Sequence, residues 1–253
     1  MFVDSHCHLD DPTLIIRLPE VLAAGRAAGV EKYLVPGVSP DGWDGIARLA
    51  EAHTGVYPAF GLHPMRAGCY DASLLTRLRS FSDRAVAIGE IGLDYLITDP
   101  PRDMQKVAFR AQLRLAVAAG LPVILHCRRA FQDLLTIFTE ENGPLVGGVM
   151  HAFSGSPEVA GDSVRLGLFI GVAGTVTYRN AVRPLAVVRN IPLKHLLVET
   201  DAPDLAPEPY RGRANEPAFL VAIAGKVAEM KGISPAEVAR VTTANAERLF
   251  KLL

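Results

Sequence analysis

Histidine and carboxylate residues recur along this sequence where short apolar runs end. The first run leads into VDSHCHLD, residues 3–10, in which His6 and His8 are separated by one residue. Side chains at positions i and i+2 of a strand share a face, so both imidazoles are expected to point the same way. The later members of the set are Glu90 in AIGEIGLDY, His126 in PVILHCR, His151 in GVMHAFSGS and Asp201 in LLVETDAP. Imidazole and carboxylate together suit Zn, Mn, Fe or Ni, and also Mg where water fills the remaining positions.

Glu90 has two carboxylate oxygens and can therefore bridge two cations. Asp201 would complete a first site with the histidines of residues 3–10, and His126 and His151 would complete a second. Two cations about 3.5–4 Å apart form a clamp for displacement at phosphorus, and they lower the pKa of a bound water from about 15.7 towards 7. The pattern therefore predicts hydrolysis that depends on divalent cations.

Short runs rich in Val, Ile and Leu alternate with longer amphipathic segments, which predicts strands interleaved with helices in a parallel sheet. Strands are expected at residues 1–6, 32–37, 55–61, 85–90, 122–127, 147–152, 168–174 and 195–200, and the clearest helices at 18–29, 105–120 and 129–142. Eight such units predict a (β/α)8 TIM-type barrel. No G-x-G-x-x-G follows the first strand, which argues against an open doubly wound sheet.

In such a barrel the carboxyl ends of all strands meet at one face, where active sites lie. The six candidate ligands fall at these strand ends, so they are expected to converge there. His53 and His195 fall outside the pattern and are expected to be structural. The residues from about Asn215 onward are typical of further helix that closes the barrel, and residues 1–253 are expected to form one domain.

Bulk composition limits the class of partner. The chain has 26 basic and 27 acidic residues, so no overall field attracts nucleic acid or an anionic membrane, and any attraction of a polyanion must be local. Three cysteines without a C-x-x-C pair fit a reduced compartment. The sequence has neither a long apolar stretch nor a leader-like N-terminus. A cytoplasmic protein is expected, without membrane attachment or an obligatory protein partner.

Taken in order, these motifs resemble those of the TatD family of metal-dependent deoxyribonucleases, within the amidohydrolase-like superfamily. The motifs that carry the resemblance are VDSHCHLD, GLHP, GEIGLDY, HCR-x-A, HAFSGS, ETDAPDLAPEP, RGRANEP and a final N-A-x-R-L-F. They cover the chain from residue 4 to about residue 250. GEIGLDY and ETDAP with HAFSGS are specific in combination, whereas H-x-H is shared across the superfamily.

The resemblance implies two divalent cations per chain, with Mg, Mn or Zn as candidates. One cation is implied on His6, His8 and Asp201 and the other on His126 and His151, with Glu90 shared between them. Asp201 and Glu90 are accordingly the expected catalytic residues, and Asp201 would also orient or deprotonate the attacking water. The family hydrolyses phosphodiester bonds in DNA, often from the 3′ ends of single strands, so DNA or nucleotide ends are the expected substrate.

Three positions depart from the family pattern. Met65 stands where a second imidazole is common, and Leu96 where a second tyrosine is common. Asp204 stands where an aromatic residue is frequent, which adds negative charge near the mouth. None of the three is a metal ligand in the implied set, but all lie where substrate would rest and therefore bear on substrate choice.

Five further residues are candidates for holding the substrate: His63, Arg128, Ser154, Arg211 and Arg213. Guanidinium groups can grip phosphates bidentately, but Arg211 and Arg213 can equally pair with acidic neighbours in a solvated loop. His63 can touch the scissile phosphate or cap a helix. Asp94 is expected to orient a ligand histidine.

Three functions are compatible with the pattern, and a two-metal phosphodiesterase acting as a 3′ exonuclease on DNA leads. With about three arginines at the mouth, about two to four phosphate contacts are expected, which favours a chain end over a long duplex. Related barrels hydrolyse amides, lactones and aminoacyl esters, but they often bridge their metals with a modified lysine, and strand four here has no lysine. The third function is a non-enzymatic metal-binding partner protein, which the intact ligand set argues against.

Overall fold

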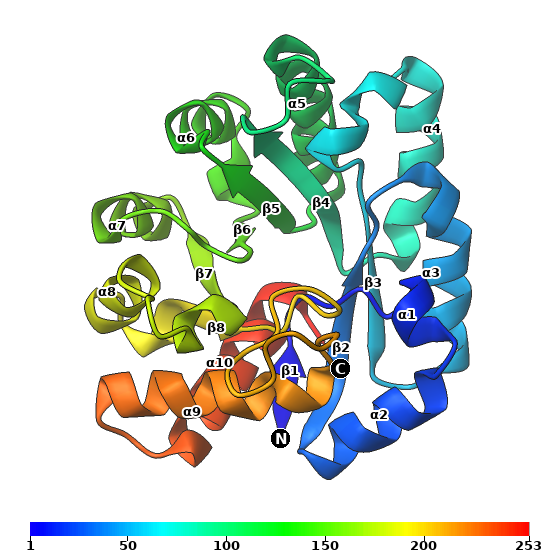
Figure 1. Cartoon of the computed structure of the whole chain (residues 1–253). Helices are drawn as coiled ribbons and strands as arrows, with labels where there is room; N and C mark the ends of the chain where they lie inside the picture. Colours follow the sequence, from blue (N-terminus) through cyan, green and yellow to red (C-terminus); the bar gives the residue numbers. More distant parts are fainter. Residues whose placement is uncertain (253) are drawn as a thin grey trace.

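Eight parallel strands run in chain order around one axis, and the computed structural model describes residues 1–252 (Figure 1). Each strand pairs in parallel with the next, from β1–β2 through to β7–β8. The strands are β1 (Phe2–Asp4), β2 (Val30–Pro36), β3 (Val56–Phe60), β4 (Ala87–Asp94), β5 (Val123–Arg128), β6 (Gly148–Met150), β7 (Leu168–Val172) and β8 (Leu196–Val198). The carboxyl ends of all strands therefore meet at one end, and the predicted (β/α)8 fold is confirmed.

Helices alternate with the strands and lie outside them (Figure 1). The α-helices are α1 (Pro12–Ile15), α2 (Leu18–Ala27), α3 (Pro40–Ala52), α4 (Ala72–Phe81), α5 (Arg102–Ala119), α6 (Phe131–Glu140), α7 (Pro157–Arg165), α8 (Arg183–Asn190), α9 (Leu220–Lys231) and α10 (Pro235–Phe250). Short 3-10 segments are η1 (Pro64–Cys69), η2 (Ser82–Arg84), η3 (Gly143–Leu145), η4 (Gly174–Thr177), η5 (Leu193–His195) and η6 (Pro217–Phe219). Within residues 1–252, no helix has the length and apolar character that crossing a membrane requires.

The N-terminal end of the barrel is closed by α10. Phe250 of this helix is buried in one apolar cluster with Val3 of β1 and Leu34 of β2. Asn245 ties the helix to the sheet, because its Nδ2 donates to the carbonyl of Leu196 at 2.9 Å. The C-terminal helix thus closes one end of the barrel, as predicted, and the opposite end stays open for a site.

The seam between β8 and β1 is joined by backbone hydrogen bonds that continue beyond the ends of both strands. The Ser5 amide donates to the carbonyl of Val198 at 3.2 Å, and the Asp201 amide donates to the carbonyl of His6 at 2.8 Å. His6 and Asp201 are far apart in the sequence, yet the seam holds their backbones side by side.

β4 differs most from its predicted extent. The sequence pattern places the strand at 85–90 with Glu90 at its end, but β4 continues to Asp94, so Glu90 lies in its interior. Its pairing with β5 shifts between Ile88 and Ile91, where β4 accommodates one extra residue. Such a bulge bends a strand and redirects a side chain. The glycines on either side of Glu90 suggest a turn in the sequence, yet here they let β4 approach β5 closely.

Candidate metal centre

A cavity of about 710 Å³ opens at the C-terminal end of the barrel. Most of the predicted site residues line it, namely His8, His63, Glu90, His126, Arg128, His151, Ser154 and Asp201. His6 is fully buried and belongs to the same cluster, as its contacts show. The histidines and carboxylates that are scattered through the sequence are therefore brought together at one mouth.

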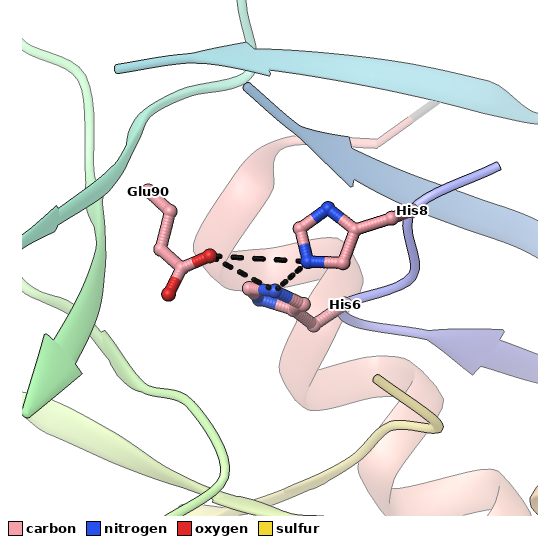
Figure 2. Close-up of side chains that lie close together, drawn as sticks. All are labelled: His6, His8 and Glu90. Atoms are coloured by element: carbon pink, nitrogen blue, oxygen red, sulfur yellow. Dashed lines mark hydrogen bonds and ion pairs between the residues drawn. The ribbon is translucent and has the colours of Figure 1, made fainter. Parts of the chain in front are cut away.

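One side of the cluster joins His6 and His8 to a single oxygen of Glu90 (Figure 2). The Nε2 atoms of the two histidines lie 3.2 Å apart, and Glu90 Oε2 lies 3.4 Å from that of His6 and 3.9 Å from that of His8. Asp201 Oδ1 approaches the same two nitrogens at 3.5 and 3.7 Å. β1 ends at Asp4, so both histidines follow the strand instead of ending it as predicted, but the seam hydrogen bonds hold this segment beside β8.

The other oxygen of Glu90 faces a second group of histidines. Glu90 Oε1 lies 2.7 Å from His151 Nε2, 2.9 Å from His126 Nδ1 and 3.4 Å from His63 Nε2. The bulge in β4 thus places one carboxylate between two groups of imidazoles, which meet where the rings of His6 and His151 stack with their centroids 4.0 Å apart. Each of the two Glu90 oxygens contacts one group.

Asp94 lies behind this second group. Its Oδ2 lies 3.0 Å from His126 Nε2, and its Oδ1 accepts a hydrogen bond from the Leu96 amide at 2.9 Å. The carboxylate is therefore fixed at one oxygen while the other orients the ring. His126 consequently presents Nδ1, not Nε2, to Glu90.

Glu199 is a buried carboxylate that sequence reasoning did not select. It accepts hydrogen bonds from the hydroxyl of Ser5 at 3.1 Å and from the amide of Ala152, and its Oε1 lies 3.9 Å from His151 Nδ1. Metal-binding histidines commonly have a carboxylate near the ring nitrogen that faces away from the metal. The available signal was a charged residue at the end of the apolar run LLVET, immediately before Thr200 and Asp201.

Asp4 is a second buried carboxylate that the sequence analysis missed. Its oxygens accept hydrogen bonds from the amide and hydroxyl of Thr200 at 2.9 and 2.5 Å, and the His6 amide lies 3.4 Å away. These contacts join β1 to the segment that carries Asp201. A charged residue inside the buried strand FVD was the signal for a role of this kind.

The charges in the cluster are strongly coupled. Burial would raise the pKa of Glu90, but the imidazoles of His151 and His63 prevail and hold that pKa well below its usual range. Burial disfavours protonation of His151, yet the charge of Glu90 raises the pKa of His151 to about 10. Burial also raises the pKa of Asp201. Glu90 is therefore ionised at neutral pH, and its charge attracts any cation that the histidines can bind.

His63 caps a helix, which is one of the two roles that the sequence left open. It lies three residues beyond β3 and caps η1, because its Nδ1 accepts a hydrogen bond from the Met65 amide at 3.1 Å. Its Nε2 nevertheless points to Glu90. Burial lowers the pKa of His63, so the ring is neutral at neutral pH. A neutral ring that accepts at Nδ1 carries its proton on Nε2, which makes that nitrogen a donor towards the cavity.

The arginine candidates separate into two groups. Arg128 ends β5, is exposed and lines the cavity. Arg211 and Arg213 are not among its lining residues. Instead, the Arg211 guanidinium lies over the ring of Tyr178 at 4.2 Å, and that of Arg213 lies 5.6 Å from the ring of Phe219. Both residues lie in the long loop after β8, and its sequence does not indicate whether their side chains point towards the cavity or away from it.

The donor set fits a divalent cation. Three groups have donor atoms within 4.8 Å of one another: His6–His8–Glu90, His6–His151–Asp201 and His63–Glu90–His126. Nitrogen from imidazole and oxygen from carboxylate are ligands that first-row transition metals accept. Two imidazole nitrogens that face each other between carboxylates form an arrangement that a positive ion stabilises.

The comparison with known proteins identifies the family. The family model described as TatD related DNase matches residues 3–251. The chain belongs to this family. The uncharacterized metal-dependent hydrolase YabD of Bacillus subtilis is 39% identical over 254 residues, which cover 100% of both chains. The 3′-5′ ssDNA/RNA exonuclease TatD of Cronobacter sakazakii is 38% identical over 239 residues, which cover 91% of this chain and 90% of that one.

A solved structure agrees with the fold described above. The crystal structure of YjjV, a TatD homologue from Escherichia coli K12, matches with a TM-score of 0.95 and 35% identity over 100% of this chain and 98% of that chain. The protein is therefore a metal-dependent hydrolase of the TatD family. Its clustered histidines and carboxylates are groups able to bind metal.

Proposed function

We propose that the protein hydrolyses phosphodiester bonds in DNA, removing nucleotides from the 3′ ends of single strands with the help of two divalent cations. The observation that carries the proposal is the division of Glu90 between two imidazole groups, one at each of its oxygens. A carboxylate that faces both groups is suited to bridging the two cations of a two-metal site. The relative from Cronobacter is named as a 3′-5′ exonuclease on single-stranded DNA and RNA, and this name supports a phosphodiester as the bond that is cleaved.

The two groups of donors would divide the cations between them. One cation would be held by His6, His8 and Asp201 and the other by His126 and His151, with Glu90 shared between them. When bound, two divalent cations supply an activated water and neutralise charge on the phosphoryl oxygens. Mg, Mn and Zn are the candidates, since imidazole favours Zn and carboxylate oxygen suits Mg and Mn.

The protein's own groups would handle the proton and the phosphate. Asp201 is a partly buried carboxylate beside the cluster and can accept the proton of the attacking water. His63 offers the Nε2 proton described above, which can be donated to a phosphate oxygen. Arg128 at the rim can hold the next phosphate along the strand. Ser154 lines the same cavity and can donate its hydroxyl to the substrate.

The size and charge of the cavity favour a strand end over a duplex. About 710 Å³ lies within the roughly 300–1,000 Å³ range of small-molecule sites, enough for a terminal nucleotide and its neighbour. The chain has a formal net charge of −1, so no overall positive field attracts a long polyanion. A single-stranded end that enters a pocket needs only local contacts.

The proposal is tested by removing and restoring metal. Purified protein is treated with a chelator, dialysed, and given Mg²⁺, Mn²⁺ or Zn²⁺ with 5′-labelled single-stranded DNA. We expect no cleavage without metal and a ladder that shortens from the 3′ end when metal is restored. Asp201→Asn, folded and treated identically, serves as the inactive control.

A substrate panel separates this function from the alternatives. Amide, lactone and aminoacyl-ester substrates are compared with the oligonucleotide by kcat/KM under the same metal conditions. A higher kcat/KM on any of these classes would replace the phosphodiesterase proposal with that activity. Absence of turnover on the whole panel, with metal bound, would favour a non-enzymatic metal-binding protein.

A further inference from the structure

The mouth of the cavity carries opposite charges on opposite sides. Asp10 and Asp204 line it on the side where β1 and β8 end, and Arg128 lines it at the end of β5. β5 stands four places from β1 in the eight-stranded order, and Figure 1 shows the two strands on opposite sides of the barrel. A substrate in the cavity therefore meets carboxylates on one side and a guanidinium on the other.

Neither carboxylate of this wall caps a helix within residues 1–252, although Asp10 lies close enough to His8 for their charges to interact. Asp11, the neighbour of Asp10, caps α1 by accepting a hydrogen bond from the Thr13 amide at 2.8 Å. Asp10 has no such role, and its Oδ1 is buried without a hydrogen-bond partner in the described chain. Asp204 is exposed and forms no salt bridge within residues 1–252. Asp204 is therefore available to a ligand, and Asp10 contributes its side chain to the same cavity wall.

The backbone that presents Asp204 is nevertheless fixed. Its amide donates to the carbonyl of Asp201 at 2.8 Å, and its carbonyl accepts a hydrogen bond from Asn215 Nδ2 at 2.7 Å. Asp204 is therefore held in a fixed relation to the metal-binding cluster even though its side chain reaches solvent. A charge presented in this way is positioned to act on the substrate.

We propose that Asp10 and Asp204 select strand ends that terminate in a 3′ hydroxyl and reject ends that carry a 3′ phosphate. This inference rests on the proposed function, because it requires the scissile phosphate at the metal cluster. The strand's remaining phosphates then extend towards Arg128, and the terminal nucleoside lies against the two carboxylates. A hydroxyl donates a hydrogen bond to a carboxylate, whereas a terminal phosphate brings about −1.5 to −2 charges against it.

Rejection by repulsion is a common source of specificity, and charges a few ångströms apart lie well within the screening length of about 8 Å at physiological ionic strength. One carboxylate facing a terminal phosphate at a distance of a few ångströms is expected to change kcat/KM by about tenfold. Two carboxylates act in the same direction. The single arginine on the far side gives the strand its orientation.

The test compares three 5′-labelled oligonucleotides of one sequence that end in 3′ hydroxyl, 3′ phosphate or 3′ methoxy. For the wild-type protein we expect kcat/KM on the hydroxyl end to exceed that on the phosphate end by about tenfold or more. Asp204→Asn and Asp10→Asn should each reduce this ratio severalfold, mainly by faster cleavage of the phosphate end. Asp83→Asn, which removes the same charge at the opposite end of the barrel, should leave the ratio unchanged.

The outcomes are distinguishable from failure of the proposed function. Cleavage of the hydroxyl end with a hydroxyl-to-phosphate ratio near one would overturn the inference and leave the exonuclease intact. If the methoxy end is rejected as strongly as the phosphate end, and neither variant relieves the rejection, size is the cause and the inference is wrong. If no end is cleaved with any cation, the proposed function fails and the inference falls with it. Asp204 is exposed, so its variant is informative even if Asp10→Asn folds poorly.

Discussion

Asp94 Oδ2 and His126 Nε2 lie 3.0 Å apart, and this contact determines which nitrogen of His126 faces the centre of the cavity. With Nε2 donating its proton to Asp94, Nδ1 is the nitrogen that faces Glu90 Oε1, 2.9 Å away, and its lone pair is the one that a cation held there would accept. The carboxylate on β4 therefore selects both the tautomer and the orientation of a side chain on β5. The ring is prepared to bind a cation before any cation arrives.

Replacing Asp94 by Asn should weaken metal binding without removing a ligand. The amide can donate to Nε2 as well as accept from it, so the tautomer with a free Nδ1 is no longer favoured. Loss of such a partner typically costs about 10–100-fold in metal affinity. Calorimetric titration of the metal-free protein with Mn²⁺ or Zn²⁺ measures the effect. Asp71→Asn, at an exposed helix N-cap where Asn is an equally good cap, is the matched control. An unchanged dissociation constant for Asp94→Asn would contradict this role.

Glu90→Gln should affect both groups of histidines at once. Glutamine keeps the shape of the side chain but loses the negative charge that lies between His6 and His151. We expect metal affinity to fall by more than about 100-fold, the upper value for loss of a residue that only orients a ligand. Cleavage should then not be restored by added metal. Metal content by mass spectrometry after gel filtration gives the measurement, and Glu51→Gln, which breaks only an exposed ion pair with Arg84, is the control. Wild-type metal stoichiometry in Glu90→Gln would show that the carboxylate does not bridge.

The barrel and the identity of its clustered residues could be predicted from sequence, because both depend on short-range pattern. Apolar runs of strand length alternate with helical periods, and the polar residues at the strand ends meet wherever a parallel barrel forms. His6 and Asp201 illustrate the point, since their proximity follows from β1 and β8 being neighbours.

What could not be predicted depends on details that the pattern does not carry. The bulge that places Glu90 inside β4 arises from a one-residue shift in pairing with β5, and apolar periodicity is not sensitive to such a shift. The stacking of Arg211 on Tyr178 depends on the path of a long loop that has no periodicity. Glu199 was missed because a carboxylate at a strand end resembles a surface residue until its burial is known.

Gly171→Ala should destabilise the protein through Glu199. A Cβ at position 171 would lie 2.7 Å from both carboxylate oxygens of Glu199, which Ser5 and Ala152 hold in place by hydrogen bonds. Overpacking of this kind costs about 1–3 kcal/mol, measurable as a loss of unfolding free energy in urea. Gly45→Ala in α3 is the control, because nothing lies within 4 Å of its Cβ and the change should stabilise the helix by about 0.5–1 kcal/mol. Equal stabilities for the wild type and Gly171→Ala would show that the Glu199 carboxylate can move aside.

Phe250→Ala should separate stability from activity. Phe250 is 2% exposed and fills the N-terminal end of the barrel together with Val3 and Leu34, so truncation should cost about 3–5 kcal/mol of unfolding free energy. The metal-binding cluster lies at the other end, beyond the strands that this residue supports, so kcat/KM per folded molecule should stay at the wild-type value. Phe250→Leu retains most of the apolar volume and should lose less stability. Urea unfolding and cleavage assays below the unfolding transition check both quantities. A fall in kcat/KM for the folded alanine variant would mean that closure of the N-terminal end of the barrel also positions the cluster at the C-terminal end.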